Sequence, residues 1–146
     1  MAAASYGGDK AIFGYGTTGS NSSISNLVSN SGVVAGDATG VGTARRLLAA
    51  CSYGGDKAIF GYGVTVSMTN LVSNTGVVSA DVTGVGTARY YLAASGYGGD
   101  KGVFAYGHSY NLIKNLVSNT GVVASDTSIA GTGRSTPGAA GYSTSA

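Results

Sequence analysis

The chain has 146 residues, of which 26 are glycine and only six are acidic, and its formal net charge is +2. This charge is too small to indicate a nucleic-acid surface, because proteins that follow a phosphate backbone gather several basic groups on one face. No apolar stretch approaches the roughly 20 residues that a membrane helix needs, and residues 1–5 lack the features of a signal peptide. We therefore expect no nucleic-acid or membrane partner, and the localisation stays unknown.

One repeat of about 45 residues occurs three times in the chain. Its constant motifs are Tyr-Gly-Gly-Asp-Lys, which begins at Tyr6, Tyr53 and Tyr97, and Asn-Leu-Val-Ser-Asn, which begins at Asn26, Asn70 and Asn115. An arginine follows each first asparagine by 19 residues and precedes the next tyrosine by 8. Spacing this constant predicts a fixed backbone. It divides the chain into repeats 2–44, 45–88 and 89–133, followed by an extra first-strand copy at 134–146.

The second repeat illustrates the four short strands that the pattern predicts. Small and apolar residues at 47–53 predict the first strand, and Gly54-Gly55 then supplies the positive φ angles of a tight hairpin. The second strand, at 57–63, is nearly all apolar, which is typical of a strand covered on both faces. The third strand is expected at 68–73 and the fourth at 77–82, separated by a turn. Helical periodicity is absent, so the sequence predicts an all-β fold.

One interval varies between the repeats and predicts a loop between the second and third strands. The distance from the glycine that ends the second strand to the asparagine of the third is 10, 7 and 8 residues. Loops on a rigid scaffold tolerate change and often carry function. Four residues of these loops are candidates for contact with a protein or a glycan: Asn21, His108, Tyr110 and Lys114. Sequence change in a loop that is not under selection would explain the same variation.

The order of these features resembles a kelch-type β-propeller blade. An arginine is followed by a strand of small residues, by Gly-Asp-Lys, and by an aromatic strand that ends in Gly-Tyr-Gly at 14–16 and 61–63. The third repeat has Ala105 in place of the first of these glycines, and the tryptophan that the family carries near its outer strand is absent. Gly/Asn/Thr-rich repeats of this style also resemble those of phage and environmental virus structural proteins, which implies a virion-associated structural role.

A kelch-like propeller with three four-stranded blades leaves two sheet faces open, because propellers close with about four to eight blades. Two copies would supply six blades, so we expect a homodimer that closes head to tail. One of the segments 2–6 and 138–143 is then redundant, and it either crosses to the partner or hangs loose. A monomeric β-trefoil or β-prism fits the same chain length, and many proteins with those folds bind sugars.

The repeated charges have two explanations. Each repeat has an aspartate 8 residues before its arginine: Asp37 and Arg45, Asp81 and Arg89, Asp126 and Arg134. Arginines that ring a central channel would hold an anion. Arginines that bind carbonyl groups or an aspartate between blades would hold the sheets together, which suits their five N–H donors. We favour this inter-blade structural role, because every repeat carries both residues.

No catalytic set is recognisable in the sequence. His108 is the single histidine and has no cysteine or second histidine near it to complete a metal site. Cys51 is the single cysteine and replaces the Ala or Ser of the other repeats, so it is expected to be a small buried filler. We therefore predict no enzyme and no cofactor. The expected function is a non-catalytic structural or interaction module, and a lectin that binds carbohydrate through its rim loops is the alternative.

Overall fold

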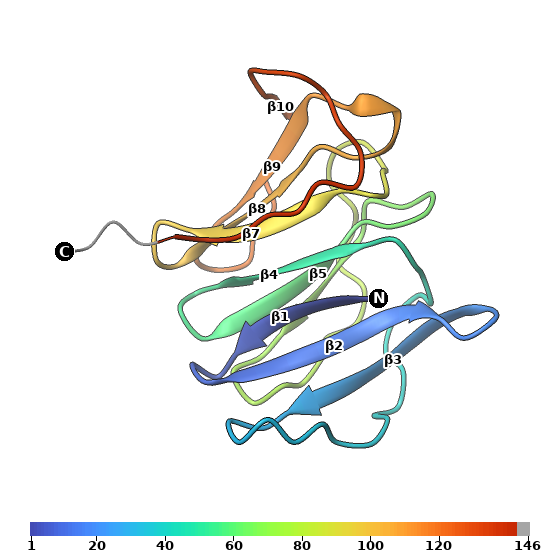
Figure 1. Cartoon of the computed structure of the whole chain (residues 1–146), viewed down its shortest axis with the longest axis vertical. Coiled ribbons are helices and arrows are strands. Elements are labelled where there is room, and N and C mark those ends of the chain that lie inside the picture. Colours follow the sequence, from blue (N-terminus) through green and yellow to red (C-terminus); the bar gives the residue numbers. More distant parts are fainter. Residues whose placement is uncertain (143–146) are drawn as a thin grey trace.

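The computed structural model describes residues 1–142, apart from the side chain of Tyr110. Its strands form three antiparallel sheets that follow one another along the chain (Figure 1). The first sheet contains β1 (Ala2–Tyr6), β2 (Lys10–Thr17) and β3 (Asn21–Val28). The second contains β4 (Ala49–Tyr53), β5 (Lys57–Gly61) and β6 (Thr69–Val72). The third contains β7 (Ala93–Tyr97), β8 (Lys101–Ala105), β9 (Ile113–Val117) and β10 (Thr127–Ser128), with the short turn η1 (His108–Tyr110) after β8.

The all-β prediction is confirmed, and chain neighbours pair within each sheet. β4 and β5 are antiparallel from Ala49 opposite Gly61 to Tyr53 opposite Lys57. The hairpin between them contains Gly54 and Gly55 with φ angles of 62° and 79°, which only glycine adopts easily. Residues 1–142 close neither into a ring nor into a barrel. No helix in this range is long and apolar enough to span a membrane.

Two strands are shorter than the sequence predicts, because the backbone turns at their ends. The second strand of the middle repeat stops at Gly61 instead of residue 63, since Tyr62 has a φ of 64°. The first strand begins at Ala49 instead of residue 47, since Leu47 has a φ of 58°. Neither conformation belongs to an extended strand.

The prediction of four strands in every sheet is wrong for the first two sheets. In the second, the expected fourth strand at 77–82 is reduced to isolated bridges from Val78 to Val72 and from Val82 to Thr69. Side chains supply some of the hydrogen bonds between these segments: Asn70 Nδ2 donates to the Ser79 carbonyl oxygen, and Ser79 Oγ accepts from the Leu71 N–H. Only the third sheet contains a regular fourth strand, the two-residue β10.

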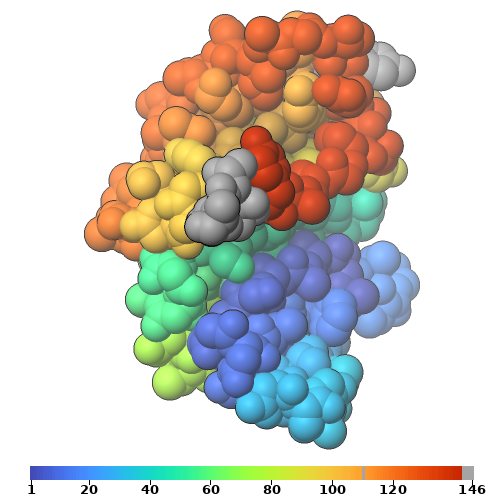
Figure 2. All heavy atoms as spheres, turned by 60° about the vertical axis from the view of Figure 1, so that its left-hand side comes forward, coloured from blue at the N-terminus to red at the C-terminus, as the bar shows by residue number. Residues whose placement is uncertain are grey.

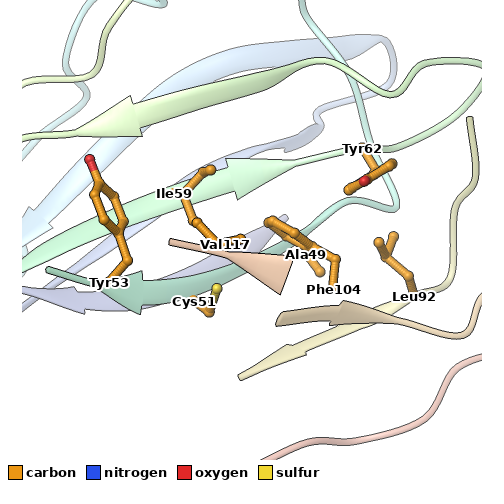
Figure 3. Packing of buried hydrophobic residues seen from close by; sticks show 8 residues of the cluster. All are labelled: Ala49, Cys51, Tyr53, Ile59, Tyr62, Leu92, Phe104 and Val117. Atoms are coloured by element: carbon orange, nitrogen blue, oxygen red, sulfur yellow. The ribbon is translucent and has the colours of Figure 1, made fainter. Parts of the chain in front are cut away.

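The core lies between the sheets, and the middle sheet is covered on both faces. Successive residues of a strand point to opposite sides. Leu48 and Phe60 pack toward the first sheet, whereas Cys51 and Ile59 pack toward the third. Figure 3 shows the second of these clusters: Ala49, Cys51, Tyr53, Ile59, Tyr62, Leu92, Phe104 and Val117. The two interfaces between sheets are therefore built from equivalent residues.

Candidate functional site

Arg45 lies between the first and second sheets and contacts both. Its guanidinium carbon is 4.1 Å from the centre of the Tyr15 ring, which belongs to the first sheet. Nε donates to the Tyr62 carbonyl oxygen at 2.9 Å and Nη2 donates to Asn70 Oδ1 at 2.6 Å, both in the second repeat. The residue is only 1% exposed. Burial lowers the pKa of the Arg45 guanidinium, but an arginine side chain stays charged at neutral pH, so these acceptors offset its loss of water.

Arg89 repeats most of this arrangement between the second and third sheets, but its Nη2 donates to the Phe104 carbonyl oxygen at 3.3 Å instead of to an asparagine. Its guanidinium carbon is 4.2 Å from the centre of the Tyr62 ring, and Nε donates to the Tyr106 carbonyl oxygen at 2.9 Å. The backbone joins the sheets at the same place, because the Gly63 N–H donates to the Arg89 carbonyl oxygen at 3.0 Å. The Gly16 N–H makes the equivalent bond to the Arg45 carbonyl oxygen. One set of contacts therefore joins both pairs of sheets.

Asp81 and Asp126 each join two segments of the chain. They bind the segment that leads into a sheet and an asparagine in the third strand of that sheet. Asp81 Oδ2 accepts from the Thr43 N–H at 3.0 Å and from Thr43 Oγ1 at 2.7 Å, and its Oδ1 accepts from Asn70 Nδ2 at 2.9 Å. Asp126 accepts the same bonds from Thr87 and Asn115. Partial burial raises the pKa of both carboxyl groups, but the hydrogen bonds outweigh it and leave each pKa below its ordinary value.

Asp37, in the first repeat, and Arg134, which follows the third repeat, make fewer contacts than the equivalent residues of the other repeats. Asp37 accepts one bond from Asn26 Nδ2 at 2.8 Å. Arg134 is exposed, its guanidinium carbon is 4.9 Å from the centre of the Tyr106 ring, and its Nη2 donates to Tyr106 Oη at 3.3 Å. Its carbonyl oxygen still accepts from the Gly107 N–H, at 3.3 Å. The third arginine thus enters the same kind of contact, with longer distances and no sheet beyond it in residues 1–142.

The four candidate loop residues do not form one site. Asn21 begins β3 in the first sheet, where its Oδ1 accepts from Arg46 Nη1. Lys114 lies within β9 in the third sheet, and Nζ donates to the Ser128 carbonyl oxygen at 3.5 Å. His108 stacks on the Tyr90 ring with centroids 4.5 Å apart. The side chain of Tyr110 lies outside the described residues.

At each interface between sheets an aromatic ring packs on a glycine. This close contact was not predicted from the sequence. A Cβ atom at Gly14 would lie 2.7 Å from Phe60 Cζ, and one at Gly61 would lie 2.5 Å from Phe104 Cζ. Only glycine permits such an approach. The repeated Phe-Gly-Tyr-Gly signal could have revealed it. The third repeat has Ala105 at this position, so a methyl group occupies the place where the next ring would sit.

Two cavities adjoin the C-terminal segment, which lies on the outer face of the third sheet; the larger cavity also reaches Ser52 and Tyr53 of the second sheet. A cavity of about 340 Å³ is lined by residues that include Ala93, Val103, Ala105 and Pro137. A second cavity of about 540 Å³ is lined by Tyr53, Tyr97 and Tyr142 among others. In Figure 1 the red segment runs alongside β7 and leaves the rest of this face without a covering sheet.

In residues 1–142 no group of three His, Cys, Asp or Glu side chains could hold a metal ion. Cys51 is buried, and burial raises the pKa of its thiol to about 12, so the nucleophilic thiolate is scarce at neutral pH.

No protein-family model matches the chain, and no curated protein matches it either. Among solved structures, the fold is similar to part of a fungal alcohol oxidase of the AA5 family in complex with copper, with a TM-score of 0.57 and 13% identity. This match covers 85% of the chain and 28% of the oxidase. A protein of unknown function from Bacteroides caccae gives a TM-score of 0.48 and 11% identity, covering 90% of this chain and 46% of that one. At such identities the likeness to the oxidase shows a shared fold alone.

Proposed function

We propose that the chain is a non-catalytic structural module that assembles head to tail with a second copy of itself, as half of a kelch-like propeller of six blades. The observation that carries this proposal is the repetition of the contacts between sheets. The bonds from Gly16 to Arg45 and from Gly63 to Arg89 join successive sheets in the same way. Each sheet is therefore a docking surface for the next. The resemblance of the repeats to phage and environmental virus structural proteins agrees with a structural role.

The third sheet leaves this docking surface largely open. Tyr97 is 40% exposed, whereas Tyr53, at the same position in the second repeat, is 4% exposed because the third sheet covers it. Leu116 is also partly exposed on the third sheet. Open apolar sheet faces favour association with another surface.

The first sheet carries the complementary surface. Phe13 stands at the position of Phe60 and Phe104, which are fully buried against the preceding sheet, but Phe13 itself is only partly buried. The Asp9 carbonyl group stands at the position of the Asp56 carbonyl, which accepts from the Gly7 N–H of the preceding sheet. Two copies joined in this way would cover both open faces of each.

The solution mass, measured by light scattering from micromolar to millimolar concentration, tests the proposal. We expect a species of two chains that dissociates on dilution. Phe13→Asp should abolish it, because docking would bury an unpaired carboxylate. Val33→Asp, which adds the same charge at an exposed position, should leave it unchanged. A folded wild-type chain that stays monomeric over this whole range would contradict the proposal.

Carbohydrate binding is a second proposal, and an aromatic cluster in the third repeat favours it. The centre of the Tyr90 ring is 4.5 Å from that of His108 and 5.2 Å from that of Tyr91, and Tyr91 is 40% exposed. Exposed tyrosine rings combine an apolar face with a polar hydroxyl group, a combination suited to sugar rings. A glycan array tests this role, with Tyr91→Ala as the variant that should lose binding. Wild-type protein that binds no glycan on the array would remove the proposal.

A further inference from the structure

Residues 138–142 lie where the first strand of a following sheet belongs. Tyr142 follows Arg134 by 8 residues, as Tyr53 follows Arg45. The Thr136 N–H donates to the Tyr91 carbonyl oxygen at 2.8 Å, which repeats the bond from the Tyr91 N–H to the Leu47 carbonyl oxygen. A Cβ atom at Gly141 would lie 3.0 Å from the carbonyl oxygen of Gly96, in β7. In Figure 2 the red residues of this segment lie against the yellow third repeat.

A second copy that docks head to tail needs the same place. In the proposed assembly its β1 would stack on β7, just as β4 stacks on β1 within the chain. The two candidates are nearly the same peptide, because β1 reads Ala-Ala-Ala-Ser-Tyr and residues 138–142 read Gly-Ala-Ala-Gly-Tyr. Both cannot occupy one position, so one of them must leave.

The contacts decide which segment leaves. β1 pairs with β2 at five positions, and its Tyr6 is buried against the second sheet. Residues 138–142 are all exposed, belong to no strand, and adjoin two cavities. Displacing the C-terminal segment therefore costs much less than displacing β1.

An exchange of strands between copies is the less favourable alternative. Residues 138–142 could pair with β2 of a second copy only after β1 of that copy had left its sheet. The exchange would replace a strand by a near copy with two additional glycines, and each glycine in a strand costs about 0.5–1 kcal/mol relative to alanine. The exchange thus gives up an existing hairpin without a compensating gain.

We infer that residues 138–142 act as a cap in cis, which competes with β1 of a second copy for the outer face of the third sheet. This inference rests on the proposed self-assembly. It makes assembly depend on the fraction of chains whose face is uncovered, because the apparent Kd is the intrinsic Kd divided by that fraction. Loosening the cap should strengthen dimerisation, and fixing it should weaken dimerisation.

One glycine substitution should loosen the cap, and a second serves as its matched control. Gly141→Val places a side chain against the Gly96 carbonyl oxygen, whereas a Cβ at Gly138 meets nothing within 4 Å. We expect Gly141→Val to lower the dimer Kd several-fold in light scattering or sedimentation, and Gly138→Val to leave it unchanged. A Gly141→Val chain with weakened dimerisation would mean that the segment is part of the interface, which overturns the inference.

A reversible disulfide fixes the cap in the full chain. A Cβ atom at Gly141 would lie 3.6 Å from Ser95 Oγ, so Ser95→Cys with Gly141→Cys, in a Cys51→Ala background, brings two thiols within bonding reach. We expect the oxidised chain to dimerise at least about tenfold more weakly than the same chain after reduction, a difference of about 1.4 kcal/mol. Equal dimerisation before and after reduction overturns the cap but leaves self-assembly intact. If wild type, reduced pair and Gly141→Val are all folded and monomeric, self-assembly itself is wrong.

Discussion

Cys51 Sγ fills the space in which a side chain at Gly102 would lie. A Cβ atom built on Gly102 would come within 2.7 Å of Sγ, across the interface between the second and third sheets. One repeat earlier, the equivalent positions hold Ala4 and Ala58, which belong to the same apolar cluster. The larger residue on one sheet is therefore matched by a smaller one on the next, as close packing in a core requires.

This matching predicts a coupled pair of substitutions. Gly102→Ala should lower the free energy of unfolding by about 1–3 kcal/mol, because the added methyl group overpacks the interface. Adding Cys51→Ala should recover most of that loss, since the pair then equals Ala4 with Ala58. Urea unfolding of wild type, both single variants and the double variant measures the coupling energy. Additive effects of the two substitutions would show that the residues do not compete for one space.

Arg45 provides a second prediction, because its removal leaves buried acceptors without donors. In Arg45→Met the Tyr62 carbonyl oxygen and Asn70 Oδ1 lose the bonds that the guanidinium makes. We expect the free energy of unfolding to fall by about 3 kcal/mol in urea denaturation at neutral pH. Arg46→Met is the matched control, since the exposed Arg46 side chain donates to Asn21 Oδ1 at the surface, and it should change stability by less than about 0.5 kcal/mol. Equal losses in the two variants would remove the special role of Arg45.

The all-β class and the hairpins could be predicted from the sequence, because the repeat places strand and turn signals at fixed intervals. Gly54-Gly55 marks a hairpin by itself, and the small residues before it and the apolar residues after it have strand composition. The strand ends could not be predicted. They depend on the positive φ angles of Leu47 and Tyr62, residue types that give no local signal for this conformation.

The contacts at the candidate site were predictable by residue type but not by partner. Arginine and aspartate stood out because every repeat carries them at one spacing. The tyrosine ring under each guanidinium could not be predicted, since Tyr15 precedes Arg45 by 30 positions and the contact forms only when two sheets stack. Likewise, no local pattern shows that Asp81 binds Thr43 of the preceding crossover. Contacts between repeats depend on the stacking geometry, which the sequence of one repeat does not contain.

Acid should destabilise the chain through Asp81 and Asp126. The pKa of each carboxyl group is lower in the folded chain, where hydrogen bonds from Thr43 or Thr87 favour the charged form despite partial burial. The unfolded chain then binds protons more readily, so this contribution is complete above about pH 4, near the ordinary aspartate pKa, and is lost as the pH falls through the folded values. Urea unfolding between pH 7 and pH 3 measures the decline. Asp81→Asn with Asp126→Asn should make it shallower, and an unchanged decline in that double variant would contradict the assignment.

Ala105 predicts how tightly two copies dock in the proposed assembly. Gly14 and Gly61 let the phenyl ring of the next sheet approach the backbone, whereas the Ala105 methyl group would keep the ring of Phe13 of a second copy farther away. Ala105→Gly should therefore lower the dimer Kd in sedimentation, while it costs the single chain about 0.5–1 kcal/mol of stability through added backbone freedom. Ala105→Val should have the opposite effect on the dimer, because it enlarges the obstacle at the same place. If both variants dimerise like wild type, Phe13 does not occupy this position, and a second copy docks in some other register.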